Sequence, residues 1–166
     1  KGNAVYFGDQ NHTGLRDKAS TGNSIRGLFA SGITSGGSRS DEIEYIALAS
    51  SGKATDFANL TQNNGHNSGM GGSSTRGIWS GGYGSSGPSK INVIEYVEIM
   101  TIGDALDFGD LTVGKGYHAG FSSGTRAFAA GGTTDAIDMI NASLFNEIRD
   151  AGVSARELAD IYDIKD

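Results

Sequence analysis

The feature that most constrains the fold of this chain is an internal repeat with a period of about fifty residues. Arginine, glycine and phenylalanine each recur three times in one register: Arg26, Arg76 and Arg126; Gly32, Gly82 and Gly132; Phe7, Phe57 and Phe108. The tripeptide Ile43-Glu44-Tyr45 also returns as Ile94-Glu95-Tyr96. Because different residue types share one spacing, we expect similar structural units that follow one another along the chain.

Each unit is predicted to consist of short antiparallel β-strands. Short apolar segments are separated by stretches rich in glycine and serine, which is typical of strands joined by turns. We expect strands at residues 25–33, 42–48, 54–60, 67–73, 76–83, 93–100, 105–111, 118–122, 126–132 and 136–140, with a weak one near 18–20. Residues 4–10 are expected to form the last strand of a preceding unit, because Phe7 stands in register with Phe57.

The end of the chain follows a different pattern. Apolar residues after residue 142 recur at helical spacing, Gly152 interrupts them, and Ser154 followed by Glu157 matches a capping box. These signals predict two short amphipathic helices, at residues 143–151 and 154–162. We therefore divide the chain into a repeat region, residues 1–141, and an acidic helical tail, residues 142–166.

Composition excludes several classes of protein. The 166 residues contain no cysteine, so no disulfide or thiolate chemistry is expected. No apolar run is long enough to span a membrane. The net charge of −6 lies mostly in the tail, a distribution that disfavours nucleic-acid binding. Because Lys1 falls inside a repeat, we expect the sequence to be an excerpt of a longer chain or a processed one.

The repeat region resembles kelch repeats. A kelch unit carries a Gly-Gly pair after its second strand and aromatic residues in its third and fourth strands. Here Gly81-Gly82, Tyr96 and Phe108 take those places, and Gly131-Gly132 repeats the pair. The first unit departs from the pattern with Ser31-Gly32, and phenylalanine stands where tryptophan is usual in the fourth strand.

This resemblance covers residues 1–140 and implies an all-β fold of kelch-like β-propeller blades, each a four-stranded antiparallel sheet, with a short α-helical tail. About two and a half to three blades are present, whereas closed propellers have about four to eight. We therefore expect other copies of the chain, or blades upstream of it, to complete the ring. A partial sheet left open would be prone to aggregation.

The short sequences IEYI, TRG and GG within the repeats are similar to kelch-like repeats of bacteriophage virion proteins. That similarity implies a non-enzymatic structural protein of the phage particle, in the tail, a fibre or the capsid surface, with a role in host attachment. Its expected partners are other virion proteins, copies of itself and a host surface glycan. The loops at residues 34–41 and 84–90 are the predicted contact surfaces, because loops on a rigid scaffold carry recognition.

Two other functions stay open at this point. A cellular kelch-type protein-interaction module would have the same repeats. An enzyme of galactose-oxidase-like architecture is less favoured, because its copper site needs a cysteine that this chain lacks. No catalytic, cofactor or metal site is predicted, and the binding residues are unknown.

Two sets of repeated residues are candidates for a metal site or an anion-binding site. His12, His66 and His118 hold similar repeat positions, and residues on different blades are not expected to converge on a metal. Arg26, Arg76 and Arg126 could bind an anionic ligand, but we favour repeated structural hydrogen bonds to neighbouring carbonyls or to Glu44 and Glu95.

The remaining candidates are predicted to be structural or silent. Phe29, Trp79 and Phe128 are expected in the core, with sugar stacking as the alternative. Asn11, Asn59 and Asn141 lie in glycosylation sequons that matter only in a eukaryotic secretory pathway. Residues 153–165 loosely resemble half of a helix-turn-helix, and docking to another subunit is the preferred interpretation. The predicted core residues are Leu28, Tyr45, Phe57, Ile78, Tyr96 and Phe108.

Overall fold

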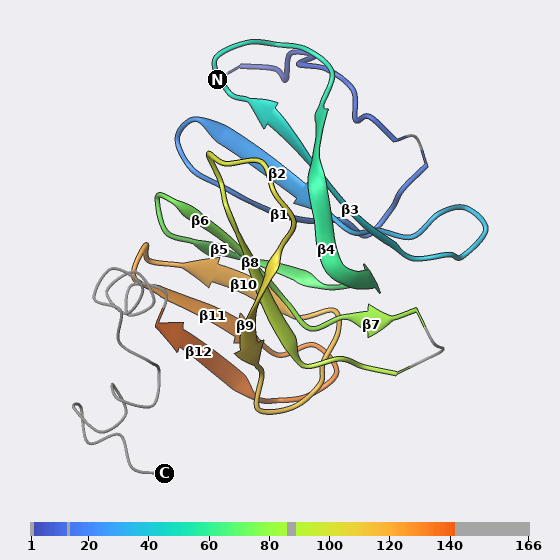
Figure 1. Cartoon of the computed structure of the whole chain (residues 1–166), viewed down its shortest axis with the longest axis vertical. Coiled ribbons are helices and arrows are strands. Elements are labelled where there is room, and N and C mark those ends of the chain that lie inside the picture. The colour runs from blue at the N-terminus through green and yellow to red at the C-terminus, as the bar shows by residue number, and fades with distance from the viewer. Residues whose placement is uncertain (1, 13, 86–88, 142–166) are drawn as a thin grey trace.

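The computed structural model describes residues 2–12, 14–85 and 89–141, and this part of the chain is all-β (Figure 1). Twelve strands form three curled antiparallel sheets that follow one another along the chain. No helix occurs among the described residues between Arg26 and Leu111, which confirms the all-β, antiparallel part of the predicted fold class. The two helices predicted at 143–151 and 154–162 lie outside the described residues.

The first sheet has the order β1-β2-β3-β4-β7 and contains β1 (Ala19–Gly22), β2 (Arg26–Ala30), β3 (Ser40–Ala47), β4 (Thr55–Gly65) and β7 (Tyr83–Gly84). The second sheet contains β5 (Ser68–Gly72), β6 (Arg76–Ser80), β8 (Val93–Glu98) and β9 (Leu106–Asp110). The third sheet contains β10 (Ala119–Ser122), β11 (Arg126–Ala130) and β12 (Ile137–Asn141).

The three sheets share one register. Leu28 pairs with Tyr45 between β2 and β3, and the equivalent pair between β6 and β8 is Ile78 with Tyr96. In the third sheet Phe128 pairs with Met139, although a shorter loop joins β11 to β12. The spacing in the sequence therefore corresponds to a structural repeat, and each residue has a defined equivalent in the other units.

The same tight turn joins the first two strands of every unit. The backbone amides of Asn23, Ser73 and Ser123 each donate to the carbonyl three residues later, at 3.0, 3.0 and 2.9 Å. The side chain of the same residue accepts the amide of the following arginine, at 2.9 Å in the first unit and 3.1 Å in the second. A side chain that satisfies backbone donors in this way favours a turn over a continued strand.

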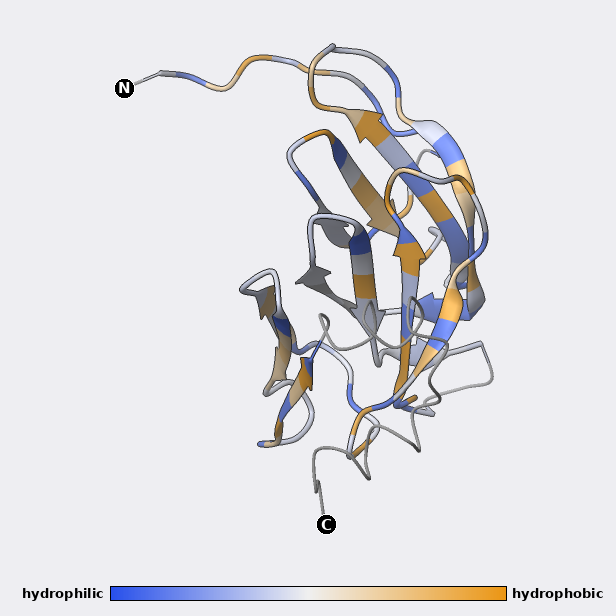
Figure 2. Ribbon diagram, turned by 60° about the vertical axis from the view of Figure 1, so that its left-hand side comes forward, coloured by the Kyte–Doolittle hydropathy of each residue, from blue (hydrophilic) through white to orange (hydrophobic). Residues whose placement is uncertain are grey.

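The apolar residues form two clusters, one between each pair of neighbouring sheets. The first cluster joins residues of the first sheet to residues of the second: Ala19, Leu28, Ala30, Ile43, Phe57, Leu60, Trp79, Val97, Ile99 and Ala105. The second joins the second sheet to the third: Ile78, Ile94, Tyr96, Leu111, Ala127, Ala129 and Ile140. Figure 2 shows hydrophobic and hydrophilic residues alternating along several strands, which places them on opposite faces of a sheet. The second sheet contributes to both clusters and so buries apolar residues on both of its faces.

Four of the six predicted core residues are buried: Leu28, Phe57, Ile78 and Tyr96. The prediction was wrong for Tyr45 and Phe108, which are only half-buried. Both still form edge-to-face ring pairs, Tyr45 with Phe57 at 6.0 Å and Phe108 with Tyr96 at 5.9 Å between centroids. Phe108 lies on the fourth strand of the second sheet, and the third sheet has no fourth strand among the described residues to cover it.

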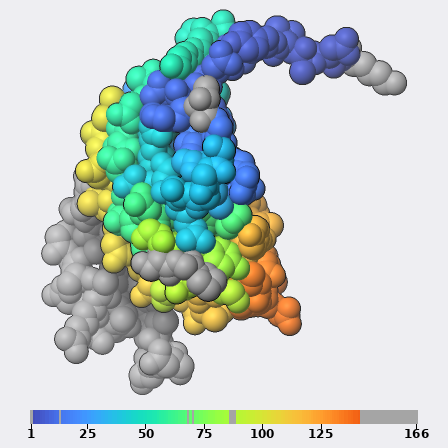
Figure 3. Space-filling model, turned by 90° about the vertical axis from the view of Figure 1, so that its right-hand side faces the viewer, coloured from blue at the N-terminus to red at the C-terminus, as the bar shows by residue number. Residues whose placement is uncertain are grey.

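Residues 4–10 do not form the predicted strand. They extend along one end of the molecule and are largely exposed (Figure 3). The amide of Gly52 donates to the carbonyl of Phe7 at 2.9 Å, and that of Ala54 to Asp9 at 2.8 Å. Ala105 donates to Asn59 in the equivalent way, at 2.8 Å. The segment therefore occupies the place of a fourth strand, and it lacks a sheet to join because no described strand precedes it.

In the described part of the chain, no helix is long and apolar enough to cross a membrane.

Candidate functional site

Each sheet has a buried carboxylate on its third strand, and in the second and third sheets it contacts a threonine of the preceding unit. Glu44, Glu95 and Asp138 occupy equivalent positions, opposite Phe29, Trp79 and Ala129, and all three are buried. Oε2 of Glu95 accepts hydrogen bonds from the amide and the hydroxyl of Thr61, at 2.8 and 2.7 Å. Oδ1 of Asp138 accepts the same two bonds from Thr112, at 2.8 and 2.6 Å.

Two of these carboxylates also contact a buried lysine. Nζ of Lys115 lies 2.6 Å from Oδ2 of Asp138, and Nζ of Lys18 lies 2.9 Å from Oε2 of Glu44. Burial alone would raise the pKa of both acids, but the hydrogen bonds from lysine and the backbone prevail and lower it. Glu95 has no lysine, and burial raises its pKa despite the bonds from Thr61. Glu44 and Asp138 are therefore balanced by a lysine of their own unit, whereas Glu95 is held by the neutral donors of Thr61.

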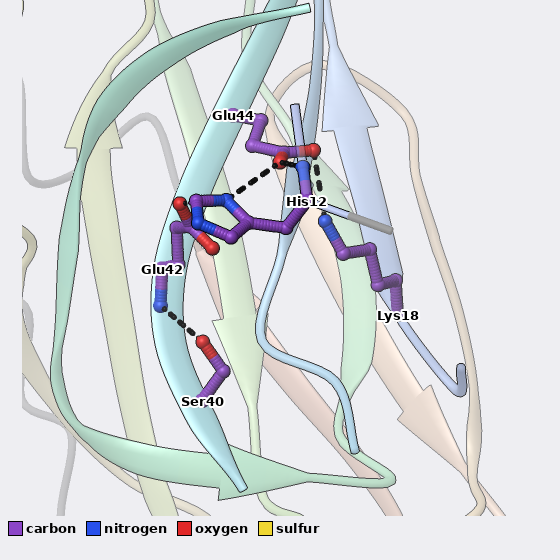
Figure 4. Close-up of polar contacts among 5 residues, drawn as sticks. All are labelled: His12, Lys18, Ser40, Glu42 and Glu44. Carbon is purple, nitrogen blue, oxygen red and sulfur yellow. Dashed lines mark hydrogen bonds and ion pairs between the residues drawn. The ribbon is translucent and has the colours of Figure 1, made fainter. Parts of the chain in front are cut away.

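The first unit carries a larger polar cluster around Glu44 (Figure 4). Nδ1 of His12 contacts Oε1 of Glu42 and lies 3.5 Å from Oε1 of Glu44, while the amide of His12 donates to Glu44 at 2.9 Å. Burial raises the pKa of Glu42, an effect that His12 opposes and Glu44 strengthens. Valine and alanine replace Glu42 in the other units, at Val93 and Ala136, so the cluster is specific to the first sheet.

The side chains of this cluster are of types that could bind a metal ion. The ligand atoms of His12, Glu42 and Glu44 lie within 4.8 Å of one another, and no other such group occurs among the described residues. However, Lys18 and the His12 amide already occupy the two oxygens of Glu44. A cation at Oε1 of Glu44 would compete with the His12 amide and share the carboxylate with the ammonium group of Lys18, so the arrangement favours an ion-pair network. Of the three histidines considered from the sequence, only His12 belongs to it.

A second cluster is built on unusual backbone geometry. Asp17, His66 and Tyr117 hold the equivalent position two residues before the first strand of each unit, and their φ angles are 59°, 57° and 60°. This left-handed conformation is uncommon for residues other than glycine, above all for a bulky residue such as tyrosine. The three side chains form a column: Oδ2 of Asp17 lies 3.3 Å from Nδ1 of His66, and the rings of His66 and Tyr117 are 4.2 Å apart.

Tyr83 and Arg39 complete this surface. The Tyr83 ring lies 5.6 Å from the rings of both His66 and Tyr117, and the Arg39 guanidinium lies 5.9 Å from the Tyr83 centroid. Nη1 of Arg39 also donates to the carbonyl of Gly84 at 2.5 Å. We call Asp17, Arg39, His66, Tyr83 and Tyr117 the aromatic ledge.

The ledge lies where the two predicted contact loops meet. Arg39 belongs to the loop at residues 34–41, and Gly84 opens the loop at residues 84–90, of which 86–88 lie outside the described residues. Tyr117 is 61% exposed, and His66 is largely buried beside it. Burial lowers the pKa of His66, which keeps its ring neutral near pH 7. The aromatic ledge combines the exposed Tyr117 ring with a carboxylate beside His66 and a guanidinium beside Tyr83, a set of groups suited to binding a polar ligand.

The repeated arginines do not form one site. Arg26 donates from Nη1 to the carbonyl of Ile99 in the following sheet at 3.0 Å, as the structural interpretation predicted. Arg76 pairs with Glu98 at 2.7 Å, so the predicted partner Glu95 was wrong. Glu98 lies opposite Arg76 on β8, whereas Glu95 points its carboxylate to Thr61. Arg126 is exposed.

The aromatic and sequon candidates are mostly structural. Trp79 is fully buried and cannot stack on a sugar, and Phe29 and Phe128 are half-buried. Asn59 lies within β4 and Asn141 ends β12. The aromatic ledge was not predicted from the sequence because its three equivalent repeat positions hold different residue types: aspartate, histidine and tyrosine. A comparison of the repeats for identical residues does not detect such positions. The available signal was their shared place before the first strand of each unit.

Comparison with models of known protein families finds no match for this chain, and no curated protein matches it either.

Proposed function

We propose that this protein is a non-enzymatic structural component of a bacteriophage particle, located in the tail, a fibre or the capsid surface, and that it contributes to host attachment. In this proposal the three sheets are blades of a kelch-like propeller, which further sheets complete. The resemblance of the repeats to those of phage virion proteins supports the setting. Self-similar packing of the sheets supports the role of a rigid scaffold.

The observation that carries the attachment role is the aromatic ledge. Tyr117 presents an exposed ring, and Asp17 and Arg39 place opposite charges beside the neighbouring rings of His66 and Tyr83. The apolar face of a sugar ring can stack on tyrosine, while its hydroxyl groups bond to the flanking polar groups. We therefore propose a host surface glycan as the ligand, bound at the ledge and at the loops beside it.

The strained backbone also favours a binding role. Holding three residues in the left-handed region costs on the order of 1–3 kcal/mol each. Such strain persists at sites where the placement of a side chain matters, and here it directs Asp17, His66 and Tyr117 into one column. A cellular kelch-type interaction module would use the same ledge for a peptide or a protein.

Glycan binding can be measured directly. The chain would be applied to an array of bacterial surface polysaccharides, and its affinity for the best ligand determined by calorimetry. Tyr117→Ala should weaken that affinity at least tenfold, because stacking is lost without a change in the core. Tyr6→Ala removes another exposed tyrosine and should leave binding unchanged.

Two results would contradict this proposal. One is the absence of binding to any polysaccharide of the array. The other is binding that Tyr117→Ala does not weaken, which would place the contact surface elsewhere.

A further inference from the structure

Positions that are buried between sheets in the first two units are uncovered in the third. Ile43 on β3 and Ile94 on β8 are 0% and 4% exposed, because the next sheet covers each of them. Their equivalent on β12 is Ile137, which is 71% exposed. Met139, the equivalent of Tyr96, is 53% exposed. This exposed face of the third sheet is equivalent to the face of the second sheet that contacts the third sheet.

At the opposite end of the molecule, the first sheet has a face equivalent to the one by which the second sheet contacts the first sheet. The second sheet contacts the first through Trp79, Val97 and Ile99, all buried. The register makes Phe29, Ile46 and Leu48 their equivalents on the first sheet. Phe29 and Ile46 are half-buried, and Leu48 is 45% exposed. The first sheet therefore carries an apolar face without a preceding sheet to cover it among the described residues.

Residues 4–10 add a strand-like element to this end. In the first two units the fourth strand pairs with the third, with Tyr45 opposite Thr55 and Tyr96 opposite Leu106. Val5 is the equivalent of Thr55, and it is 88% exposed. Among the described residues, β12 pairs with β11 alone. The repeat register therefore places Val5 opposite Met139 if a segment like residues 4–10 were to pair with β12.

We propose that copies of this chain associate head to tail. Residues 4–10 of one copy add as a fourth strand beside β12 of the next copy, and the outer face of the first sheet covers Ile137 and Met139. Both contacts form together, because residues 4–10 are hydrogen-bonded to Gly52 and Ala54 at the edge of the first sheet. The new interface repeats, in register, the two that the chain already contains.

The second copy is the occupant that the structure defines most fully. The two halves of the interface are present on one chain, and the internal sheet contacts supply a template for each residue. Addition of a strand to a sheet provides backbone hydrogen bonds, and the apolar faces provide the burial. Because the two surfaces differ, the contact is heterologous and builds a closed ring or a filament. Two copies with three sheets each would supply six sheets, within the range of about four to eight blades in closed propellers. The inference rests on the proposed structural function in one respect: it takes the partner to be another copy of this chain.

Sedimentation velocity on the full 166-residue chain tests this association. The unmodified chain should form dimers or larger species whose share rises with concentration. Met139→Lys places a charge in the interface at a position that is exposed in one copy, so folding should survive and the apparent association should weaken at least tenfold. Ile102→Lys alters another exposed apolar residue and should leave association unchanged.

A cross-link tests the register itself. The chain has no cysteine, so the double variant Val5→Cys with Met139→Cys introduces the sole pair. Oxidation should produce covalent dimers or larger multimers that reductant abolishes, whereas Val5→Cys with Ile102→Cys should not.

Three outcomes would overturn the proposal: a chain that stays monomeric at every concentration, association that Met139→Lys does not weaken, or a cross-link formed within one chain. Glycan binding is read separately on the same samples. Its failure with association intact would count against the attachment role alone.

Discussion

The hydroxyl and the amide of Thr112 both donate to one oxygen of Asp138, and Thr61 makes the same two bonds to Glu95. Thr61 lies within β4 and Thr112 follows β9, so each pair connects the fourth-strand segment of one sheet to the third strand of the next. The repeat thus extends beyond apolar packing to a buried polar contact. A buried carboxylate requires such donors, because an unpaired charge in the interior is costly.

We predict that Thr61→Val destabilises the fold by about 1.5–3 kcal/mol, the range for a lost hydrogen bond to a charged group. Valine keeps the shape of the side chain, so the loss reports the hydroxyl. Chemical denaturation measures the free energy of unfolding. Thr55→Val, at an exposed position of the same strand, should change that energy little, and an equal loss in both variants would refute the assignment.

A second prediction concerns Lys115, which is fully buried beside Asp138. Lys115→Met should cost about 3–5 kcal/mol, because it leaves a buried carboxylate without its cation. Replacing the pair together, with Asp138→Leu added, should recover much of the loss. Thermal or chemical unfolding of Lys115→Met, Asp138→Leu and the double variant checks this. If the double variant is as unstable as the sum of the single ones, the two residues are not coupled.

A third prediction concerns pH. Burial, and then the charge of Lys115, lower the pKa of His118 to about 4, and its Nε2 lies 2.9 Å from Oγ of Ser80. An unfolded chain binds a proton at histidine near pH 6.5, so it holds more protons than the folded chain between about pH 6.5 and 4. Stability should therefore fall as the pH falls through this window, by about 2 kcal/mol between pH 7 and 5.

The contribution of His118 can be isolated by comparing pH profiles. His118→Gln should remove most of the decline between pH 7 and 5, measured as the free energy of unfolding in denaturant at each pH. An unaltered slope in this variant would assign the decline to other groups.

A fourth prediction separates two equivalent phenylalanines. Phe57 is buried and Phe108 is half-buried. Phe57→Ala should cost about 3–5 kcal/mol, the usual range for this change in a core, and Phe108→Ala should cost less. Thermal melts of both variants check the order. A larger loss at Phe108 would mean that its surroundings are more closely packed than the described residues indicate.

Much of the fold could be predicted from the repeat register alone. Residues such as Leu28 and Ile78 lie at alternating apolar positions that fix the buried face of a strand. The short strand β7 could not be predicted, because Tyr83 and Gly84 pair with the extended end of β4 only after the chain has folded back. The strand expected at residues 4–10 failed because a strand needs a partner, and local propensity does not supply one.

The candidate site was less predictable than the fold. The loops at residues 34–41 and 84–90 were identified from composition, but their contact through Arg39 and Gly84 depends on tertiary structure. The column of Asp17, His66 and Tyr117 joins three residue types whose spacing carries no chemical motif. The polar cluster at His12 lies where the first unit differs in sequence from the other two. A comparison of the repeats for identical residues does not detect such a difference as a site.

The central claim is that three consecutive units form the same antiparallel sheet in the same register. Nuclear magnetic resonance tests it through contacts between strands in the folded chain. We predict cross-strand contacts for Phe29 with Glu44, Trp79 with Glu95, and Ala129 with Asp138. A third sheet shifted by one residue, or a helix within residues 26–85, would contradict the claim.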